Sequence, residues 1–87
     1  MKKYKVVLEP GAQKQLKKIE TKQSQMIQKW IKTNLVGCSD PYIYGKMLKS
    51  NIKNIWKYSV GNYRLFSKIY NKHIFITIIK LNHEKEI

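Results

Sequence analysis

The spacing of apolar residues predicts one strand and two helices in the first half of the chain. Residues 4–8 are rich in β-branched side chains, and this run stops before Pro10, a residue suited to the first turn of a helix. A second helix is expected to begin at Thr21 as its cap and to end by Gly37. The apolar positions at helical spacing are Ala12, Leu16, Ile19, Met26, Ile27, Trp30, Ile31 and Leu35. The short connection predicts an antiparallel helical hairpin that lays one apolar side on a sheet.

The apolar period changes to two in the second half, which is typical of strands. Residues 38–45 read as a loop, with Tyr42, Ile43 and Tyr44 expected against the body, and residues 46–48 as a short strand. Residues 55–60, 63–70 and 73–81 then alternate, joined by Gly61-Asn62 and Asn71-Lys72. Such two-residue connections predict tight hairpins and a three-stranded antiparallel meander.

These elements together predict an α+β fold. It consists of a strand, an antiparallel helix hairpin and the meander, with two helices on one face of one small sheet. No linker or repeat interrupts residues 1–87, so we expect a single domain.

The Gly61-Asn62 turn determines which residues share a face, because directly opposed residues lie on the same side of a sheet. The expected pairs are Val60 with Tyr63, Ser59 with Arg64, Tyr58 with Leu65, Lys57 with Phe66, and Trp56 with Ser67. The predicted core face carries Trp56, Tyr58, Val60, Tyr63, Leu65, Ile69, Ile74, Ile76 and Ile78. The predicted second face carries Ile55, Lys57, Ser59, Arg64, Phe66, Lys68, Tyr70, Phe75, Thr77 and Ile79.

The charge balance indicates an anionic partner. The 87 residues carry a formal charge of +13, and 43% of them are hydrophobic, which is typical of a folded domain. Nucleic acid, an acidic protein and a membrane surface all fit this charge. The membrane is the weakest of the three, because the longest apolar run, residues 74–79, is far too short to span a bilayer. With no apolar segment after the first lysines, we expect a cytoplasmic protein.

The cysteine and histidine content argues against a metal site. Cys38 is the single cysteine, and His73 and His83 are distant from it in sequence, so no metal-ligand spacing is present. We interpret Cys38 as an ordinary loop or half-buried thiol and His73 as a turn residue. In a domain of this size a large cofactor pocket is not expected, and no cofactor is predicted.

Arg64 stands out because it is the single arginine among eighteen basic residues. Its planar guanidinium can donate two parallel hydrogen bonds to a phosphate, which lysine cannot imitate. Cations interleaved with exposed aromatic rings favour single-stranded nucleic acid, since phosphates meet the charges and bases stack on the rings. The alternative is a solvated lysine-rich face with Phe66 and Phe75 covered by the chain ends.

The order of motifs resembles the RelE/ParE family of toxins from type II toxin-antitoxin systems. The motifs are Asp40-Pro41, Gly45-Lys46-Met47-Leu48, Ile55-Trp56-Lys57-Tyr58, the signature Val60-Gly61-Asn62-Tyr63-Arg64-Leu65, and Leu81-Asn82-His83. The resemblance implies a fold similar to microbial ribonucleases and an acidic antitoxin as partner. In the RelE-like branch it also implies cleavage of mRNA on the ribosome, with Arg64 at the scissile phosphate, Lys57 on the preceding strand and Lys53 as a looser match.

Cleavage of RNA by its own 2′-hydroxyl needs a base, an acid and positive charge at the phosphate. Arg64 supplies charge, and Lys57 is a candidate base or second phosphate ligand. His83 is a candidate acid-base residue, because imidazole exchanges protons near neutral pH, and strand continuation through Leu81 is expected to place it on the side of Arg64. The expected RNA-binding residues are Lys46, Lys49, Lys53, Lys57, Arg64, Phe66 and Lys68. Helix lysines are either a solvated face or contacts to ribosomal RNA.

Two departures from the family pattern keep other functions open. Glu84 stands where the family often has arginine, and the sequence stops at Ile87 without the tyrosine that commonly follows. Either the chain is truncated just before an aromatic terminus, the acid-base chemistry is redistributed to His83 and Glu84, or the protein cleaves poorly. The alternatives are a ParE-like inhibitor of DNA gyrase without catalysis, or a weakly active or inactive basic RNA-binding relative.

Overall fold

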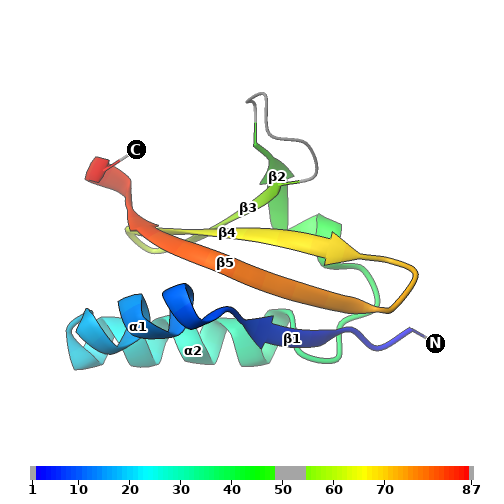
Figure 1. Ribbon diagram of the computed structural model, residues 1–87, viewed down its shortest axis with the longest axis horizontal. Helices are drawn as coiled ribbons and strands as arrows, with labels where there is room; N and C mark the ends of the chain where they lie inside the picture. The colour runs from blue at the N-terminus through cyan, green and yellow to red at the C-terminus, as the bar shows by residue number, and fades with distance from the viewer. Residues whose placement is uncertain (1, 49–54, 87) are drawn as a thin grey trace.

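The computed structural model describes residues 2–48 and 55–86. Figure 1 shows the chain as a small sheet with two helices along one face. In chain order the elements are β1 (Lys5–Leu8), α1 (Pro10–Lys18), α2 (Thr21–Asn34), the 3-10 turn η1 (Pro41–Tyr44), β2 (Gly45–Met47), β3 (Ile55–Val60), β4 (Tyr63–Tyr70), β5 (Phe75–His83) and the 3-10 turn η2 (Glu84–Glu86). No helix among the described residues is long and apolar enough to cross a membrane.

The sheet of the described chain has five strands in the order β1-β5-β4-β3-β2. β3, β4 and β5 form the expected antiparallel meander, β2 adds to one edge, and β1 pairs with β5 in parallel at the other. Parallel neighbours need a long crossover, and α1 and α2 lie within the chain between β1 and β5. The predicted α+β class and the position of both helices on one face are confirmed (Figure 1).

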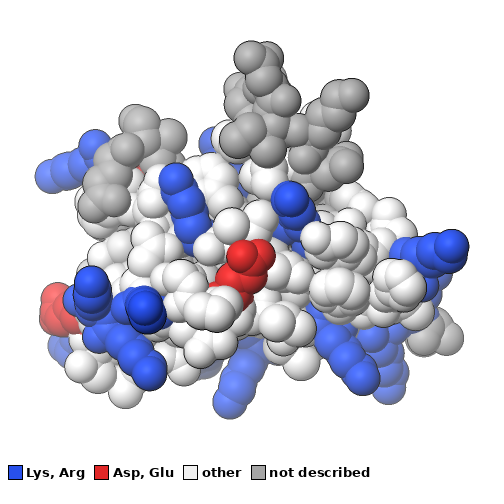
Figure 2. Space-filling view, viewed as in Figure 1, with Lys and Arg blue, Asp and Glu red and all other residues white. Residues whose placement is uncertain are grey.

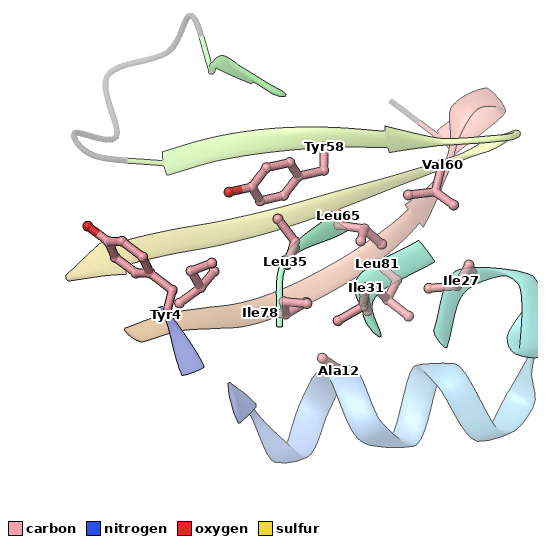
Figure 3. Close-up of a cluster of buried hydrophobic side chains, with 11 residues drawn as sticks. Tyr4, Ala12, Ile27, Ile31, Leu35, Tyr58, Val60, Leu65, Ile78 and Leu81 are labelled. Atoms are coloured by element: carbon pink, nitrogen blue, oxygen red, sulfur yellow. The ribbon is translucent and has the colours of Figure 1, made fainter. Parts of the chain in front are cut away.

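The hydrophobic core lies between the helices and the sheet. Figure 3 shows Ala12 of α1 and Ile27 and Ile31 of α2 directed toward side chains of the strands. Tyr58 is fully buried there, and its hydroxyl donates to the carbonyl oxygen of Pro41 over 2.8 Å. The buried cluster contains Tyr4, Ala12, Ile27, Ile31, Leu35, Tyr58, Val60, Leu65, Ile76, Ile78 and Leu81.

The boundaries of both helices match the expected starts at Pro10 and Thr21. The expected cap at Thr21 is wrong, because Glu20 occupies the cap position and its side chain makes no capping hydrogen bond. The helix ends at Asn34, and Gly37 follows in a turn with φ of +76°. Glycine adopts that left-handed conformation without the steric cost that a Cβ brings.

The β3–β4 hairpin has the predicted register. All five expected pairs are present, from Val60 with Tyr63 at the turn to Trp56 with Ser67. Gly61 has a φ of +58°, the conformation that tight hairpin turns demand. Because β4 continues without interruption to Tyr70, its side chains alternate regularly between the two faces.

The second turn is longer than predicted. Tyr70 pairs with Phe75, so four residues, not two, connect β4 to β5, and Ile74 has a φ of +56°. Asn71 holds this turn in place, because its side-chain oxygen accepts hydrogen bonds from the hydroxyls of Tyr4 and Tyr42. Contacts from distant parts of the chain therefore override the local two-residue pattern.

A register shift interrupts the pairing of β4 with β5. Ser67 pairs with Ile78 and Phe66 with Lys80, so Ile79 is an extra residue. A bulge of this kind reverses the face on which the following residues point. Beyond the end of β1, the Gln15 amide takes the place of a neighbouring strand, because it donates to the carbonyl of Leu81 over 2.7 Å and accepts from its N–H over 2.8 Å.

Candidate functional site

An open pocket of about 390 Å³ lies at β2, β3 and the start of β4. Its cations are Lys46, Lys57 and Arg64. The remaining lining residues are Ile43, Tyr44, Gly45 and Ser59. The pocket therefore combines three positive charges with an aromatic ring.

Strand register explains how the three cations meet. Lys46 is directly opposite Lys57 in the β2–β3 pair, and Ser59 is opposite Arg64 in the β3–β4 pair. Lys57 and Ser59 are two residues apart on β3, so all four side chains lie on the sheet face opposite the helices. We call this the open face.

Gly45 allows β2 to lie close to β3. A Cβ at this position would be 2.5 Å from the carbonyl oxygen of Lys57 and 2.8 Å from the Tyr58 ring. The backbone oxygen cannot move aside without disrupting the strand. Glycine at this position therefore sets the approach of Lys46 to Lys57.

Tyr58 and Asp40 position the wall of the pocket. The Tyr58 hydroxyl bonds to Pro41 at the start of η1, and the Asp40 carboxylate accepts from the N–H of Tyr42 over 3.1 Å. Ile43 and Tyr44 then project outward, with 67% and 39% of their surfaces exposed. The expectation that this segment lies against the body is wrong for Ile43, which the 3-10 turn directs into the pocket. It is confirmed for Tyr42, whose ring packs edge-on against Trp56, and for Tyr44, whose ring lies 6.4 Å from that of Trp30 on α2.

The guanidinium of Arg64 is held by its own hairpin. Nη1 donates to the carbonyl oxygens of Gly61 and Tyr63 over 3.1 and 3.0 Å. Nη2 lies 3.4 Å from Oε2 of Glu84, and 21% of the arginine side chain remains exposed. Glu84 is itself anchored, because its N–H donates to the carbonyl of Asn62 over 2.7 Å. Arg64 thus points across the turn with a carboxylate beside it.

The sequence model of the ParE toxin of type II toxin-antitoxin systems matches residues 6–87, nearly the whole chain. The chain belongs to this family. A search of curated proteins gave no match.

Solved structures of related toxins share the toxin's fold. The toxin in the RelBE2 toxin-antitoxin complex of Mycobacterium tuberculosis has a TM-score of 0.85 at 23% identity, with 95% of this chain and 93% of that chain covered. The toxin in the intact E. coli RelBE complex has a TM-score of 0.74 at 17% identity, with 92% of this chain and 95% of that chain covered. The archaeal RelE-RelB complex of Pyrococcus horikoshii has a TM-score of 0.73 at 16% identity, with 98% of this chain and 99% of that chain covered. These likenesses establish that the toxin has the RelE fold.

His83 lies on the opposite side of the sheet from Arg64. It pairs with Tyr63, whose ring is 5.2 Å away, and it lines a hollow with Gln15 and Ile19 of the helical hairpin. Asn82, not His83, is opposite Arg64. The prediction that His83 shares the face of Arg64 is wrong, because the bulge at Ile79 reverses the alternation of β5.

Phe66 is on the expected face but is not available for stacking. Only 8% of its surface is exposed, and the Lys80 ammonium lies 5.7 Å from its ring centroid. Its prediction as an exposed RNA-stacking residue is therefore wrong. Lys68 is half-buried on the open face, opposite Ile55. Lys49 and Lys53 lie outside the described residues.

The chemical groups of the toxin restrict what this pocket can do. Within residues 2–48 and 55–86, no cluster of three His, Cys, Asp or Glu side chains is arranged to hold a metal ion. Burial raises the pKa of the Cys38 thiol, which leaves little reactive thiolate at neutral pH. Figure 2 shows basic side chains spread over the face in view and few acidic ones. The pocket is therefore suited to bind an anion.

Sequence reasoning missed Tyr44, Ile43 and Asn82 as neighbours of the cations. A local signal existed for the first two, since Asp40-Pro41 is a common start for a tight turn. Asn82 was hidden because its face depends on the bulge.

Proposed function

We propose that this toxin is a ribosome-dependent mRNA endonuclease that inhibits translation. The observation that carries the proposal is the pocket in which Lys46, Lys57 and Arg64 surround a space open to solvent. A scissile phosphate gains negative charge in the transition state, and preorganised cations stabilise that charge.

The proposed reaction is attack of the ribose 2′-hydroxyl on the adjacent phosphate. A bond forms from the 2′-oxygen to phosphorus, and the bond to the 5′-oxygen breaks. The leaving 5′-oxygen takes a proton from water, so the products are a 2′,3′-cyclic phosphate and a 5′-hydroxyl. Lys57 is our candidate to accept the 2′-hydroxyl proton or to hold a phosphate oxygen, and Arg64 holds the phosphate. His83 is not part of this proposed site, because it faces the helices.

An acidic antitoxin is the proposed protein partner, and the cytoplasm is the proposed location. The formal charge of +13 favours an acidic protein through charge complementarity. The similar toxins of Mycobacterium tuberculosis and E. coli were solved in toxin-antitoxin complexes. The exposed lysines of α1 and α2 are proposed contacts to ribosomal RNA.

The proposal is tested by primer extension on one message in a reconstituted translation reaction. We expect new 5′ ends with the wild-type toxin and their loss, by at least about a hundredfold, with Arg64→Ala. Lys3→Ala changes an exposed lysine before β1, outside both helices and the pocket, and serves as the control for charge. Equal cutting by Arg64→Ala, or no cutting of translated message by the wild type, would overturn the proposal.

Inhibition of DNA gyrase is the second candidate function. It is favoured by the match to the ParE toxin family and by the absence of a described histidine or unpaired carboxylate beside Arg64. A supercoiling assay with purified gyrase distinguishes the two, because an inhibitor blocks supercoiling while translated message stays intact. A third outcome, RNA binding without either activity, identifies a weakly active or inactive relative.

A further inference from the structure

Two aromatic rings form an exposed stack at the other end of the open face. Tyr70 and Phe75 are partners in the β4–β5 register, and their rings stack with centroids 4.5 Å apart and planes 16° from parallel. Tyr70 keeps 39% of its surface exposed, and Phe75 is half-buried. The ring of His73 lies 6.4 Å from that of Phe75. The two inner ring faces cover each other, so the aromatic surface left for a ligand is the outer side of the stack, mainly on Tyr70.

The pair shares its face with Arg64. Tyr70 is six residues from Arg64 along β4, and β4 alternates without a bulge, so both side chains lie on the open face. Six residues of strand span about 20 Å. A single strand of nucleic acid can therefore cross the face from the basic pocket to the rings.

The stack has no evident role in the core. Neither Tyr70 nor Phe75 belongs to the hydrophobic cluster between the sheet and the helices. Both helices lie on the opposite face (Figure 1), and within the described chain neither of them covers these rings.

Cations flank the rings on the same face. Lys68 is two residues before Tyr70 on β4, and Lys5 is the β1 partner of Phe75. Lys72 is exposed in the adjoining turn. An apolar protein surface would have to desolvate these ammonium groups, whereas a phosphate backbone would be attracted by them.

We propose that Tyr70 and Phe75 form a second RNA-binding site, on which an unpaired base stacks. The base belongs to the same strand whose phosphate lies in the pocket of Arg64, so this inference rests on the proposed function. The strand needs to be at least about four nucleotides long, which is the lower end of sites on single-strand-binding folds. Stacking accepts every base, so the site adds affinity with little sequence preference.

Fluorescence anisotropy with two RNAs tests this proposal. The probes are a labelled 2′-O-methyl oligo(A) of eight nucleotides, which the proposed reaction cannot cleave, and a dinucleotide of the same chemistry. The variants are Tyr70→Ala, Phe75→Ala and Tyr70→Phe, which keeps the ring. Val36→Ala, in the exposed turn after α2, is the control, and thermal unfolding midpoints verify folding of each variant.

We expect Tyr70→Ala and Phe75→Ala to weaken octamer binding by about 5- to 150-fold, the range measured for loss of one stacked base. Dinucleotide binding stays unchanged, and Tyr70→Phe and Val36→Ala bind both probes as the wild type does. Equal loss for octamer and dinucleotide would overturn the proposal by indicating a general change of the fold.

Unchanged octamer affinity in both alanine variants would overturn the proposal. Arg64→Ala in the same assay separates this result from failure of the proposed function. If Arg64→Ala still weakens binding, the pocket remains an RNA site without the aromatic extension. If the wild type binds neither probe, the second RNA-binding site is refuted, whereas cutting of translated message by the wild type and not by Arg64→Ala still supports the proposed function.

Discussion

The carboxylate of Glu84 lies 3.4 Å from the guanidinium of Arg64, which lines the basic pocket. The pair is partly exposed, at 21% and 44% for the two side chains, so water screens the attraction and its contribution to stability is below about 1 kcal/mol. Its greater consequence is electrostatic. A phosphate that approaches Arg64 must compete with a negative charge that is already present.

Removing the charge of Glu84 should therefore strengthen RNA binding. We expect Glu84→Gln to lower the dissociation constant for single-stranded RNA by about 2- to 5-fold, since an exposed pair of opposite charges couples by up to about 1 kcal/mol. The steepness of the salt dependence should increase, because one more cation is free to meet a phosphate. Anisotropy titrations at several salt concentrations measure both quantities.

Glu20→Gln is the matched control for Glu84→Gln, because Glu20 is exposed at the start of α2 on the helical side. An unchanged affinity in Glu84→Gln would mean that the carboxylate does not compete with RNA.

Gly45→Ala should damage the pocket by displacing β2. The new methyl group would meet the carbonyl oxygen of Lys57 at 2.5 Å, and overpacking against backbone costs about 1–3 kcal/mol. We expect a lower unfolding free energy in urea and weaker RNA binding, because Lys46 moves away from Lys57. Gly11→Ala is the control, since a Cβ there meets nothing within 4 Å and alanine favours the helix. Equal behaviour of the two variants would argue against a close β2–β3 approach.

Tyr58→Phe tests how the pocket wall is held. Loss of the hydroxyl leaves the buried Pro41 carbonyl without its partner, and we expect a loss of about 1–2 kcal/mol of unfolding free energy at pH 7. RNA binding should weaken as η1 loosens. Urea denaturation and anisotropy measure the two effects.

The same variant has a predictable pH dependence. Burial raises the pKa of Tyr58, so the folded state holds the neutral phenol while the unfolded chain ionises near pH 10. The stability contributed by the buried neutral phenol is fully present below the pKa of tyrosine in the unfolded chain. It is lost as the pH rises above that value. The difference in unfolding free energy between the wild type and Tyr58→Phe should therefore narrow between about pH 9 and 11. A constant difference across that range would contradict a buried neutral phenol.

Gln15→Ala should loosen β5 just before the turn that carries Glu84. Both backbone groups of Leu81 lose their partner, and each unpaired buried group costs about 1–3 kcal/mol where water cannot replace it. Hydrogen exchange of the Leu81 amide should accelerate strongly. Gln25→Ala, exposed on α2, should leave that amide protected. Unchanged exchange in Gln15→Ala would mean that the bulge does not depend on this amide.

Local signals were sufficient for most of the fold. The Gly61-Asn62 turn and the alternation beside it determined the β3–β4 register, and with it the shared face of Lys57 and Arg64. The helix starts followed from Pro10 and the apolar spacing. In each of these cases the deciding interactions lie within a few residues of one another.

Non-local contacts decided what the sequence pattern missed. The face of His83 depends on the bulge at Ile79. Close to this bulge, the side-chain amide of Gln15 is hydrogen-bonded to the backbone of Leu81, 66 residues away in sequence. The exposure of Tyr44 depends on the bond from Tyr58 to Pro41, and the long turn at Asn71 on Tyr4 and Tyr42. Alternation alone cannot reveal an inserted residue, so every face assignment beyond Ile79 was reversed. The roles of Lys49 and Lys53 remain predictions.

The central claim is that the guanidinium of Arg64 holds a phosphate of the RNA. Since Arg64 is the single arginine, the Nε–Hε signal of arginine in a ¹⁵N NMR spectrum reports on this side chain alone. We predict that titration with short single-stranded RNA shifts this signal along the binding curve, and that Arg64→Lys, which lacks the signal, binds more weakly. RNA binding at full affinity with an unshifted arginine signal would contradict the account.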